Sequence, residues 1–328
     1  WSRVFPMDVR PQAHEIIRTW LFSSVVRAHL EDNSLPWTNA AISGWILDPD
    51  RKKMSKSKGN VVTPMDLLDE YSSDAVRYWA ASARPGADTA FDIGQMKIGR
   101  RLAIKLLNAS KFVLGLQGEQ DSAADAPVTE ALDRALLARL AGVVDEATAA
   151  FEDYNYARAL ELAESFFWDF TDDYVELVKD RAYSTTPAGA SARAALAISL
   201  DTLLRLFAPV LPFTTEEVWS WWRADSVHRS TWPSADELRA RAADGDPRLI
   251  DDLAEVLTLV RRVKSDAKVS MKAPIATATV RAPHDQVERL RAATADISAV
   301  GRITDLQFAP VDAALDVDVV LAEAEPTA

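Results

Sequence analysis

The segment Lys53–Asn60, with the sequence KMSKSKGN, holds the residue types best suited to chemistry in this chain. Its three lysines alternate with Met54 and with small hydroxyl residues. Flexible ammonium groups suit a triphosphate, whose oxygens need positive charge wherever negative charge builds up in a transition state. Gly59 can adopt a positive φ and bring the backbone close to a ligand. The segment lacks the spacing of a P-loop. Taken alone, it is either a phosphate-binding loop or a solvated basic loop.

Two further groups of cations could contact a polyanion, although the formal net charge of the chain is -12. The basic residues are unevenly distributed, because the first 115 residues hold 16 Lys and Arg against 12 Asp and Glu. The first group has a spacing of four residues, which puts its members on one face of a helix: Lys97, Arg101 and Lys105. The second group consists of Arg261, Arg262 and Lys264. Each group is either a phosphate-binding face or an ordinary solvated face.

The hydrophobic pattern predicts the elements that position these side chains. Apolar residues three or four apart predict a helix over 11–30, and an apolar run bounded by turn residues predicts a strand over 41–47. A polar loop over 51–63 follows, and then two short helices over 64–79. This order is typical of the last third of a parallel α/β domain.

The rest of the sequence predicts a mainly α protein. From residue 98 onward, long apolar stripes predict an antiparallel bundle of helices. Thr214 and Glu217 have the spacing of a capping box and predict the start of another helix. After the breaker-rich segment 233–247, the pattern predicts a small α+β module with helices over 249–263 and 287–292 and strands over 276–280 and 315–321.

The composition excludes several classes of protein. The chain has no cysteine, which excludes a disulfide scaffold or a thiolate metal site. No apolar run approaches the roughly 18–20 residues that span a bilayer, and no secretory pattern is present, so we expect a cytoplasmic protein without a membrane partner. The acidic residues Asp169, Asp172 and Asp173 lack the spacing of a dedicated site, so we expect no protein-bound metal. The chain starts at Trp1, which suggests a piece of a longer protein.

Four segments, in their order along the chain, resemble the valyl group of class I aminoacyl-tRNA synthetases. The octet resembles the KMSKS loop of that class, and Pro6–Trp20 resembles the valyl segment upstream of it. Ala83–Gly86 and Leu107–Phe112 resemble the stem-contact region and the entry to the anticodon-binding bundle. The run Ala208–Trp219 is shared by the valyl, isoleucyl, leucyl and methionyl enzymes.

The resemblance implies both a fold and a function. The fold would be the C-terminal remnant of a Rossmann-type catalytic domain (1–64), a stem-contact region (65–96), a helical anticodon-binding bundle (97–232) and a small α+β module (245–328). The function would be that of valine–tRNA ligase, which uses ATP, accompanied by Mg²⁺, to attach valine to tRNA(Val) through valyl-adenylate. The HIGH motif, the editing domain and the coiled-coil arm of the family are absent from this sequence. We therefore expect the C-terminal half of such an enzyme, inactive alone.

The resemblance also implies roles for single residues. Lys53 and Lys56 would be catalytic, because they would hold the ATP phosphates in the adenylate-forming transition state. The other ATP-binding candidates are Ser55, Ser57, Lys58, Gln12 and His14. The candidates for tRNA contact are Lys97, Arg101, Lys105, Arg261, Arg262 and Lys264. His14 could instead be a partly buried helix histidine, and we expect Trp45 in the core rather than against adenine.

Two other functions stay open at this point. The chain could be a non-catalytic tRNA-binding protein derived from a synthetase. It could also belong to a sister isoleucyl- or leucyl-tRNA synthetase.

Overall fold

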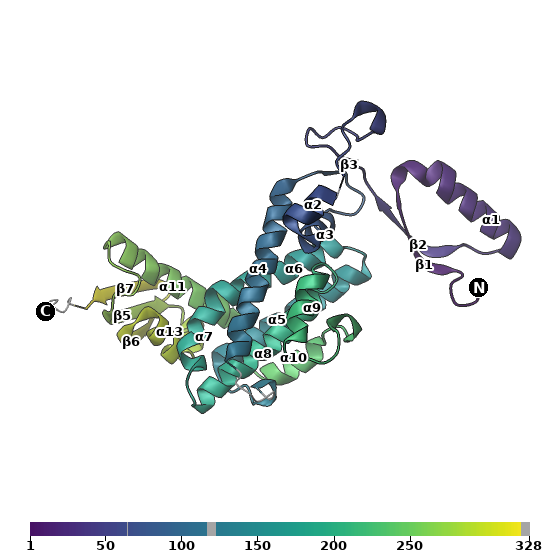
Figure 1. Cartoon of the computed structure of the whole chain (residues 1–328). Helices are drawn as coiled ribbons and strands as arrows, with labels where there is room; N and C mark the ends of the chain where they lie inside the picture. Colours follow the sequence, from purple (N-terminus) through teal and green to yellow (C-terminus); the bar gives the residue numbers. More distant parts are fainter. Residues whose placement is uncertain (64, 117–122, 323–328) are drawn as a thin grey trace. The chain divides into compact units, whose positions relative to one another are not determined.

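The computed structural model describes residues 1–63, 65–116 and 123–322, and it is mostly helical with small sheets (Figure 1). The chain divides into two compact units that interleave along the sequence. The first comprises Trp1–Leu106, Glu146–Leu162 and Phe207–Glu217. The second comprises Leu107–Asp145, Ala163–Leu206 and Val218–Ala328. Among the described residues, no helix combines the length and the apolar character needed to cross a membrane.

The first unit opens with two parallel strands joined by a helical connection, which parallel pairing requires. β1 (Met7–Ala13) pairs with β2 (Trp37–Ser43), with Gln12 opposite Ile42. The prediction started the helix over 11–30 too early, because its first residues pair in β1. Sheet pairing outweighs the local spacing of apolar residues there. The connection consists of a 3₁₀ turn (His14–Ile16), a π-helical turn (Ile17–Leu21) and α1 (Phe22–Asp32).

The strand predicted over 41–47 is divided between two sheets. β2 ends at Ser43, and β3 (Ile46–Leu47) pairs in parallel with β4 (Thr89–Ala90). Gly44 lies between them, where a Cβ atom would stand 2.3 Å from the carbonyl oxygen of Ala87. The absence of a side chain at Gly44 therefore lets two backbone segments pass each other.

Three helices follow the polar loop and share a small core. They are α2 (Met65–Tyr71), α3 (Ser73–Ala81) and the part of α4 (Ile93–Gly115) up to Leu106. Tyr71, Ala75 and Met96 are buried together at their junction. A Cβ atom on Gly99 would lie 2.6 Å from the Cβ of Tyr78, so this glycine permits close approach of α4 to α3.

The start of α9 (Pro212–Ser220) shows that the capping-box prediction is wrong. Thr214 does not cap its own helix; its hydroxyl donates to the carboxylate of Asp74, which belongs to α3. The same carboxylate accepts hydrogen bonds from the backbone N–H groups of Phe213 (3.2 Å) and Thr214 (2.7 Å). A residue distant in sequence thus supplies the acceptor that the first turn of a helix needs.

The second unit is built around long, buried helices. One of them is α8 (Pro187–Phe207), which is rich in Ala and Leu, the best helix formers, and has several fully buried residues. The other helices with residues in this unit are α5 (Ala131–Glu152), up to Asp145, α6 (Tyr156–Asp169), from Ala163 onward, α7 (Val175–Ala182) and α10 (Ala235–Ala242). Short turns lie at Ala123–Asp125, Phe170–Tyr174 and Val227–Arg229.

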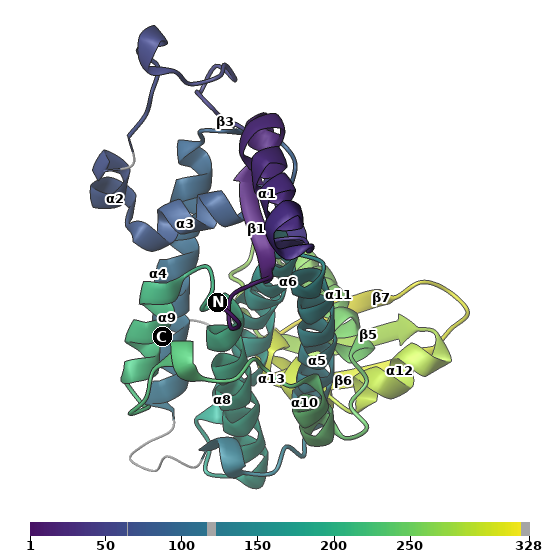
Figure 2. The same cartoon turned by 90° about the vertical axis from the view of Figure 1, so that its right-hand side faces the viewer.

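A C-terminal module of helices and a three-stranded sheet completes the second unit (Figure 2). The strand order is β6-β5-β7, with β5 parallel to β6 and antiparallel to β7. The prediction found β5 and β7 but missed β6, whose burial is only partial. The elements are α11 (Arg248–Asp266), β5 (Ile275–Ala282), α12 (His284–Arg291), α13 (Thr294–Gly301), β6 (Ile303–Pro310) and β7 (Asp316–Leu321).

Candidate phosphate-binding loop and nucleic-acid interface

Asn60 holds the two ends of the Lys53–Asn60 loop together. Its Oδ1 accepts a hydrogen bond from the backbone N–H of Ser55 (2.9 Å), and its Nδ2 donates to Asp48 Oδ2 (2.7 Å) and to the Lys53 carbonyl (3.3 Å). Asp48 is buried and also accepts from the N–H of Lys52 at 2.8 Å. The N–H of Lys52 and the amide of Asn60 lower the pKa of Asp48, so the carboxylate is ionised at neutral pH.

The middle of the loop is a short exposed turn. A 3₁₀ turn covers Lys56–Lys58, and the N–H of Lys58 donates to the Ser55 carbonyl at 3.1 Å. Gly59 has a φ of 66°, as the sequence predicted, with no atom within 4 Å of the position that a Cβ would take. The hydroxyls of Ser55 and Ser57 lie 3.3 Å apart. The side chain of Lys56 lies outside what the structure describes.

Lys53 is held by a carboxylate and an indole ring. Its Nζ lies 2.7 Å from Glu15 Oε2 and 4.2 Å from the ring centre of Trp45. Trp45 is half-buried and donates from its indole N–H to the same Glu15 oxygen at 3.0 Å. The hydrogen bond from Lys53, followed by that from Trp45, lowers the pKa of Glu15. Sequence reasoning missed Glu15, because nothing in its spacing separates it from an ordinary solvated glutamate.

Gln12 lies near the end of β1, and His14 is the first residue of the 3₁₀ turn that follows it. The imidazole of His14 is 4.7 Å from the Trp45 ring, and its Nδ1 is 3.2 Å from the Ser43 carbonyl oxygen. The amide of Gln12 is buried, and neither of its polar atoms has a partner among the described residues. The structure therefore places His14 and Lys53 against the Trp45 ring, and it leaves the Gln12 amide on β1 with unused hydrogen-bonding capacity.

An apolar cavity of about 200 Å³ lies beneath the start of the loop. Met54 lines it, although its neighbours in sequence are polar. The remaining lining residues are Ile46, Val62, Leu67, Val76, Trp79 and Phe91. Contact of the half-buried Met54 side chain with these residues anchors the start of the loop.

The cations of α4 follow the predicted face. Lys97 and Arg101 are exposed and Lys105 is half-buried. Their spacing of four residues aligns them along one side of a continuous helix. Among the described residues, no group of three or more His, Cys, Asp or Glu side chains could hold a metal ion.

Aromatic side chains at the C-terminal end of α4 were missed by the sequence reasoning. Phe112 packs edge-on against Tyr183, with ring centres 6.2 Å apart, and Tyr183 is 64% exposed. The ammonium of Lys179 lies 6.0 Å from the Phe112 ring, and that of Lys111 lies 5.8 Å from the Trp221 ring. Exposed aromatic rings beside cations are the usual surface on which unpaired nucleic-acid bases stack.

The second predicted basic group requires a correction. Arg261 and Arg262 are exposed; Arg261 lies 3.9 Å from Asp173, and Arg262 lies 3.9 Å from Asp266. Lys264 is 2% exposed, and its ammonium donates to the carbonyls of Met271 (3.1 Å) and Gly301 (3.0 Å). Burial lowers the pKa of Lys264. The prediction that Lys264 contacts tRNA is therefore wrong, because its ammonium supports the interior of the module.

Two family descriptions match this chain. Residues 1–92 match "tRNA synthetases class I (I, L, M and V)", and residues 133–280 match "Anticodon-binding domain of tRNA ligase". The first match contains the loop described above, and the second contains α6, α7 and α8.

Two similar proteins are both named valine–tRNA ligase. The chain is 62% identical to a protein named valine–tRNA ligase from Thermobifida fusca, over 99% of this chain and 37% of that protein. It is 55% identical to one of the same name from Salinispora tropica, over 98% of this chain and 39% of that protein. The chain thus spans less than half the length of these relatives.

Two solved structures show a similar fold. One is a LeuRS from Agrobacterium radiobacter solved in a ternary complex with tRNA and LeuAMS, with a TM-score of 0.58 and 23% identity over 71% of this chain and 29% of that one. The other is the apo methionyl-tRNA synthetase of Mycobacterium tuberculosis, with a TM-score of 0.52 and 20% identity over 66% of this chain and 44% of that one. At these identities the comparison concerns the fold alone.

Proposed function

We propose, on the premise that this chain belongs to the valine–tRNA ligases of class I, that it supplies their ATP phosphate loop and a tRNA-binding surface. The observation that carries the proposal is the KMSKSKGN loop, whose backbone is held by the hydrogen bonds of Asn60. The loop occurs in a chain 62% identical to the Thermobifida fusca valine–tRNA ligase. The complete enzyme would react valine with ATP to give valyl-adenylate and pyrophosphate. It would then transfer the valyl group to tRNA(Val).

Charge neutralisation is the role of the loop in this proposal. The ammonium groups of Lys53 and Lys56 would contact phosphate oxygens on which negative charge increases in the transition state. Ser55, Ser57 and Lys58 would line the same site. The loop offers ammonium and hydroxyl groups and no carboxylate, so Mg²⁺ would be held mainly by the phosphates of ATP, since this ion prefers oxygen ligands.

Two carboxylates would act as positioning groups around the loop. Asp48 fixes Asn60, which in turn fixes the backbone at Ser55. Glu15 holds Lys53 against Trp45 until phosphate oxygens compete for the ammonium. Gln12 and His14 would contact the adenosine part, a role that the unpartnered amide of Gln12 supports.

The tRNA-binding surface would combine phosphate contacts with base stacking. Lys97, Arg101 and Lys105 on α4, together with Arg261 and Arg262 on α11, would contact phosphates. Phe112 and Tyr183 would accept unpaired bases of the anticodon loop. The four predicted segments, 1–64, 65–96, 97–232 and 245–328, would be the catalytic-domain remnant, the stem-contact region, the anticodon-binding bundle and the α+β module. We place the complete enzyme in the cytoplasm, where tRNA and ATP meet.

Aminoacylation assays with the complete ligase that contains this chain test the proposal. We expect valine-dependent pyrophosphate exchange and valylation of tRNA(Val), and no charging with isoleucine or leucine above the background of misactivation. Charging of another tRNA would point to a sister synthetase, and a complete protein with no exchange activity would point to a non-catalytic tRNA-binding protein. The 328-residue chain by itself is expected to give no exchange, because it carries no HIGH motif.

A further inference from the structure

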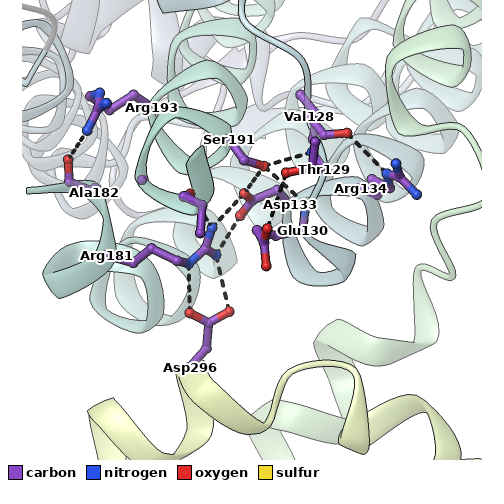
Figure 3. Close-up of polar contacts among 12 residues, drawn as sticks. Val128, Thr129, Glu130, Asp133, Arg134, Arg181, Ala182, Ser191, Arg193 and Asp296 are labelled. Carbon is purple, nitrogen blue, oxygen red and sulfur yellow. Dashed lines mark hydrogen bonds and ion pairs between the residues drawn. The ribbon is translucent and has the colours of Figure 1, made fainter. Parts of the chain in front are cut away.

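One arginine joins the helices of the second unit to the C-terminal module. Arg181, on α7, binds Asp133 of α5 and Asp296 of α13 with its guanidinium (Figure 3). Nη1 and Nη2 each donate to Asp133 at 2.8 Å, and Nε and Nη2 donate to Asp296 at 2.8 and 3.1 Å. Nη1 also donates to the Ala188 carbonyl at 2.9 Å. All five N–H groups of the guanidinium are therefore used.

The helices alone hold this arginine in position. Asp133 is fully buried and also accepts hydrogen bonds from the hydroxyls of Tyr174 (2.8 Å) and Ser191 (2.6 Å). The Ser191 oxygen in turn accepts from the backbone N–H of Thr129 at 2.9 Å. Contacts among the helices thus hold Asp133 and Arg181 to each other, and Asp296 is the partner that the module contributes.

The other ion pairs between these parts are more exposed. Arg139 of α5 binds Asp251 of α11 at 2.5 Å, but the Asp251 side chain is largely in solvent. Arg261 lies 3.9 Å from Asp173. Exposed pairs contribute little to stability, whereas a bidentate, largely buried arginine–carboxylate pair fixes both distance and angle. Of these three ion pairs, the one that Asp296 makes therefore constrains the position of the module most closely.

We propose that Asp296 is a positioning residue for tRNA recognition. By fixing the module against α7, it determines where the exposed cations of the module meet the tRNA backbone; these are Arg262, Lys268 and Lys272. The inference rests on the proposed function. Without Asp296 the cations remain, but they are no longer held in one place, so phosphate contacts are lost.

Asp296→Asn tests this inference, and Asp252→Asn is its matched control. Both aspartates are 7% exposed and both bind an arginine, but Asp252 binds Arg289 (2.6 Å) and Gln286 (2.9 Å) within the module. Because the chain has no cysteine, spin labels can be attached at Glu176→Cys on α7 and Asp305→Cys on β6, both exposed. We expect Asp296→Asn to broaden the distance distribution between the labels and Asp252→Asn to leave it narrow.

Binding and kinetics complete the test. We expect Asp296→Asn to weaken tRNA binding by the chain about tenfold, the effect of losing one or two phosphate contacts near 0.1 M salt. In the complete ligase, KM for tRNA should rise by a similar factor while kcat and valine-dependent pyrophosphate exchange stay constant, which also shows that the variant folds. Asp252→Asn should leave all these values within about twofold of the parent.

The outcomes of these experiments distinguish failure of the positioning role of Asp296 from failure of the proposed function. If the parent chain binds tRNA and Asp296→Asn binds it equally well, or keeps a narrow distance distribution, the positioning role is refuted and the proposed function stands. Equal losses in both variants also refute it, since they would reflect general destabilisation. A parent chain and a complete ligase that bind no tRNA refute the proposed function and this inference together.

Discussion

At the scale of single residues, the candidate loop is organised by side chains outside the lysines themselves. Asn60 links Ser55, Lys53 and Asp48, and Glu15 links Lys53 to Trp45. The lysine ammonium groups need freedom to follow phosphate charge, whereas the backbone that carries them must be fixed. The lysines therefore supply charge that can move, whereas Asn60 fixes the backbone that carries them.

Replacement of Lys56 should affect the chemical step selectively. If its ammonium contacts charge that forms only in the transition state, Lys56→Ala in the complete ligase should lower kcat for valine activation by about 10²- to 10³-fold. The KM for valine should change little. Lys52→Ala is the control, because its side chain is exposed and pairs with Asp50 on the surface at 3.5 Å. Pyrophosphate exchange measures both; equal rates for the two variants would make the segment a solvated basic loop.

Removal of the Asn60 side chain should misplace the loop without removing any charge. Asn60→Ala loses the contacts to Ser55, Lys53 and Asp48, so we expect kcat for activation to fall about 10- to 100-fold. Asn39→Ala is the control, because Asn39 also bonds a backbone carbonyl but belongs to β2. Pyrophosphate exchange and a thermal melt are the measurements. An Asn60→Ala variant with the pyrophosphate-exchange rate of the parent would show that the loop keeps its shape without the hydrogen bonds of Asn60.

At the scale of elements, local pattern predicted the helices well and long-range partners poorly. The spacing of apolar residues predicted helices α5 and α8 and strands β5 and β7. It did so because the apolar positions of an element mark the face that it buries. The capping box at Thr214 failed because Asp74, far away in sequence, provides the acceptor. The prediction that Lys264 contacts tRNA failed for the same reason, because two carbonyl groups of the module accept hydrogen bonds from its ammonium.

Motifs proved more informative than composition about function. Four ordered segments gave the family, which the comparisons confirm, although the net charge of -12 argued against a nucleic-acid partner. The loop residues were named from sequence, but Glu15, Phe112 and Tyr183 were not. A single glutamate or aromatic residue carries no periodic signal, and its role emerges only when the fold places a lysine or another ring beside it.

The cationic face of α4 should show itself in the salt dependence of tRNA binding. Each phosphate contact releases counterions, so Arg101→Ala with Lys105→Ala should flatten the log-log slope of affinity against salt by roughly 1 to 2. The control is Arg158→Ala with Arg281→Ala, which removes the same amount of charge from two partly exposed arginines outside α4. Fluorescence anisotropy from low to physiological salt provides the data. If both double variants change the slope equally, α4 has no special role in binding.

At the scale of the whole molecule, burial differs strongly between segments. The residues Ala194–Ala197 of α8 are fully buried. By contrast, α1 exposes large apolar side chains, with Phe22 63% and Leu30 78% exposed, and β1 and β2 form a sheet of two strands. Two-stranded sheets are marginally stable in water, and exposed apolar side chains add no burial energy. The 7–43 segment should therefore open locally far more often than the helical core of the second unit.

Hydrogen exchange followed by mass spectrometry can measure this difference in the 328-residue chain. We expect backbone amides of β1, α1 and β2 to exchange at least about a hundredfold faster than those of α8, because the opening free energies differ by several kcal/mol. Amides of α10 serve as the internal control and should exchange at intermediate rates, because this helix of 8 residues is shorter than α1 with its 11 but buries Leu238 and Ala242. Protection of 7–43 equal to that of α8 would mean that the exposed apolar face of α1 is covered in solution, and self-association measured by sedimentation would then identify a second copy of the chain as the cover.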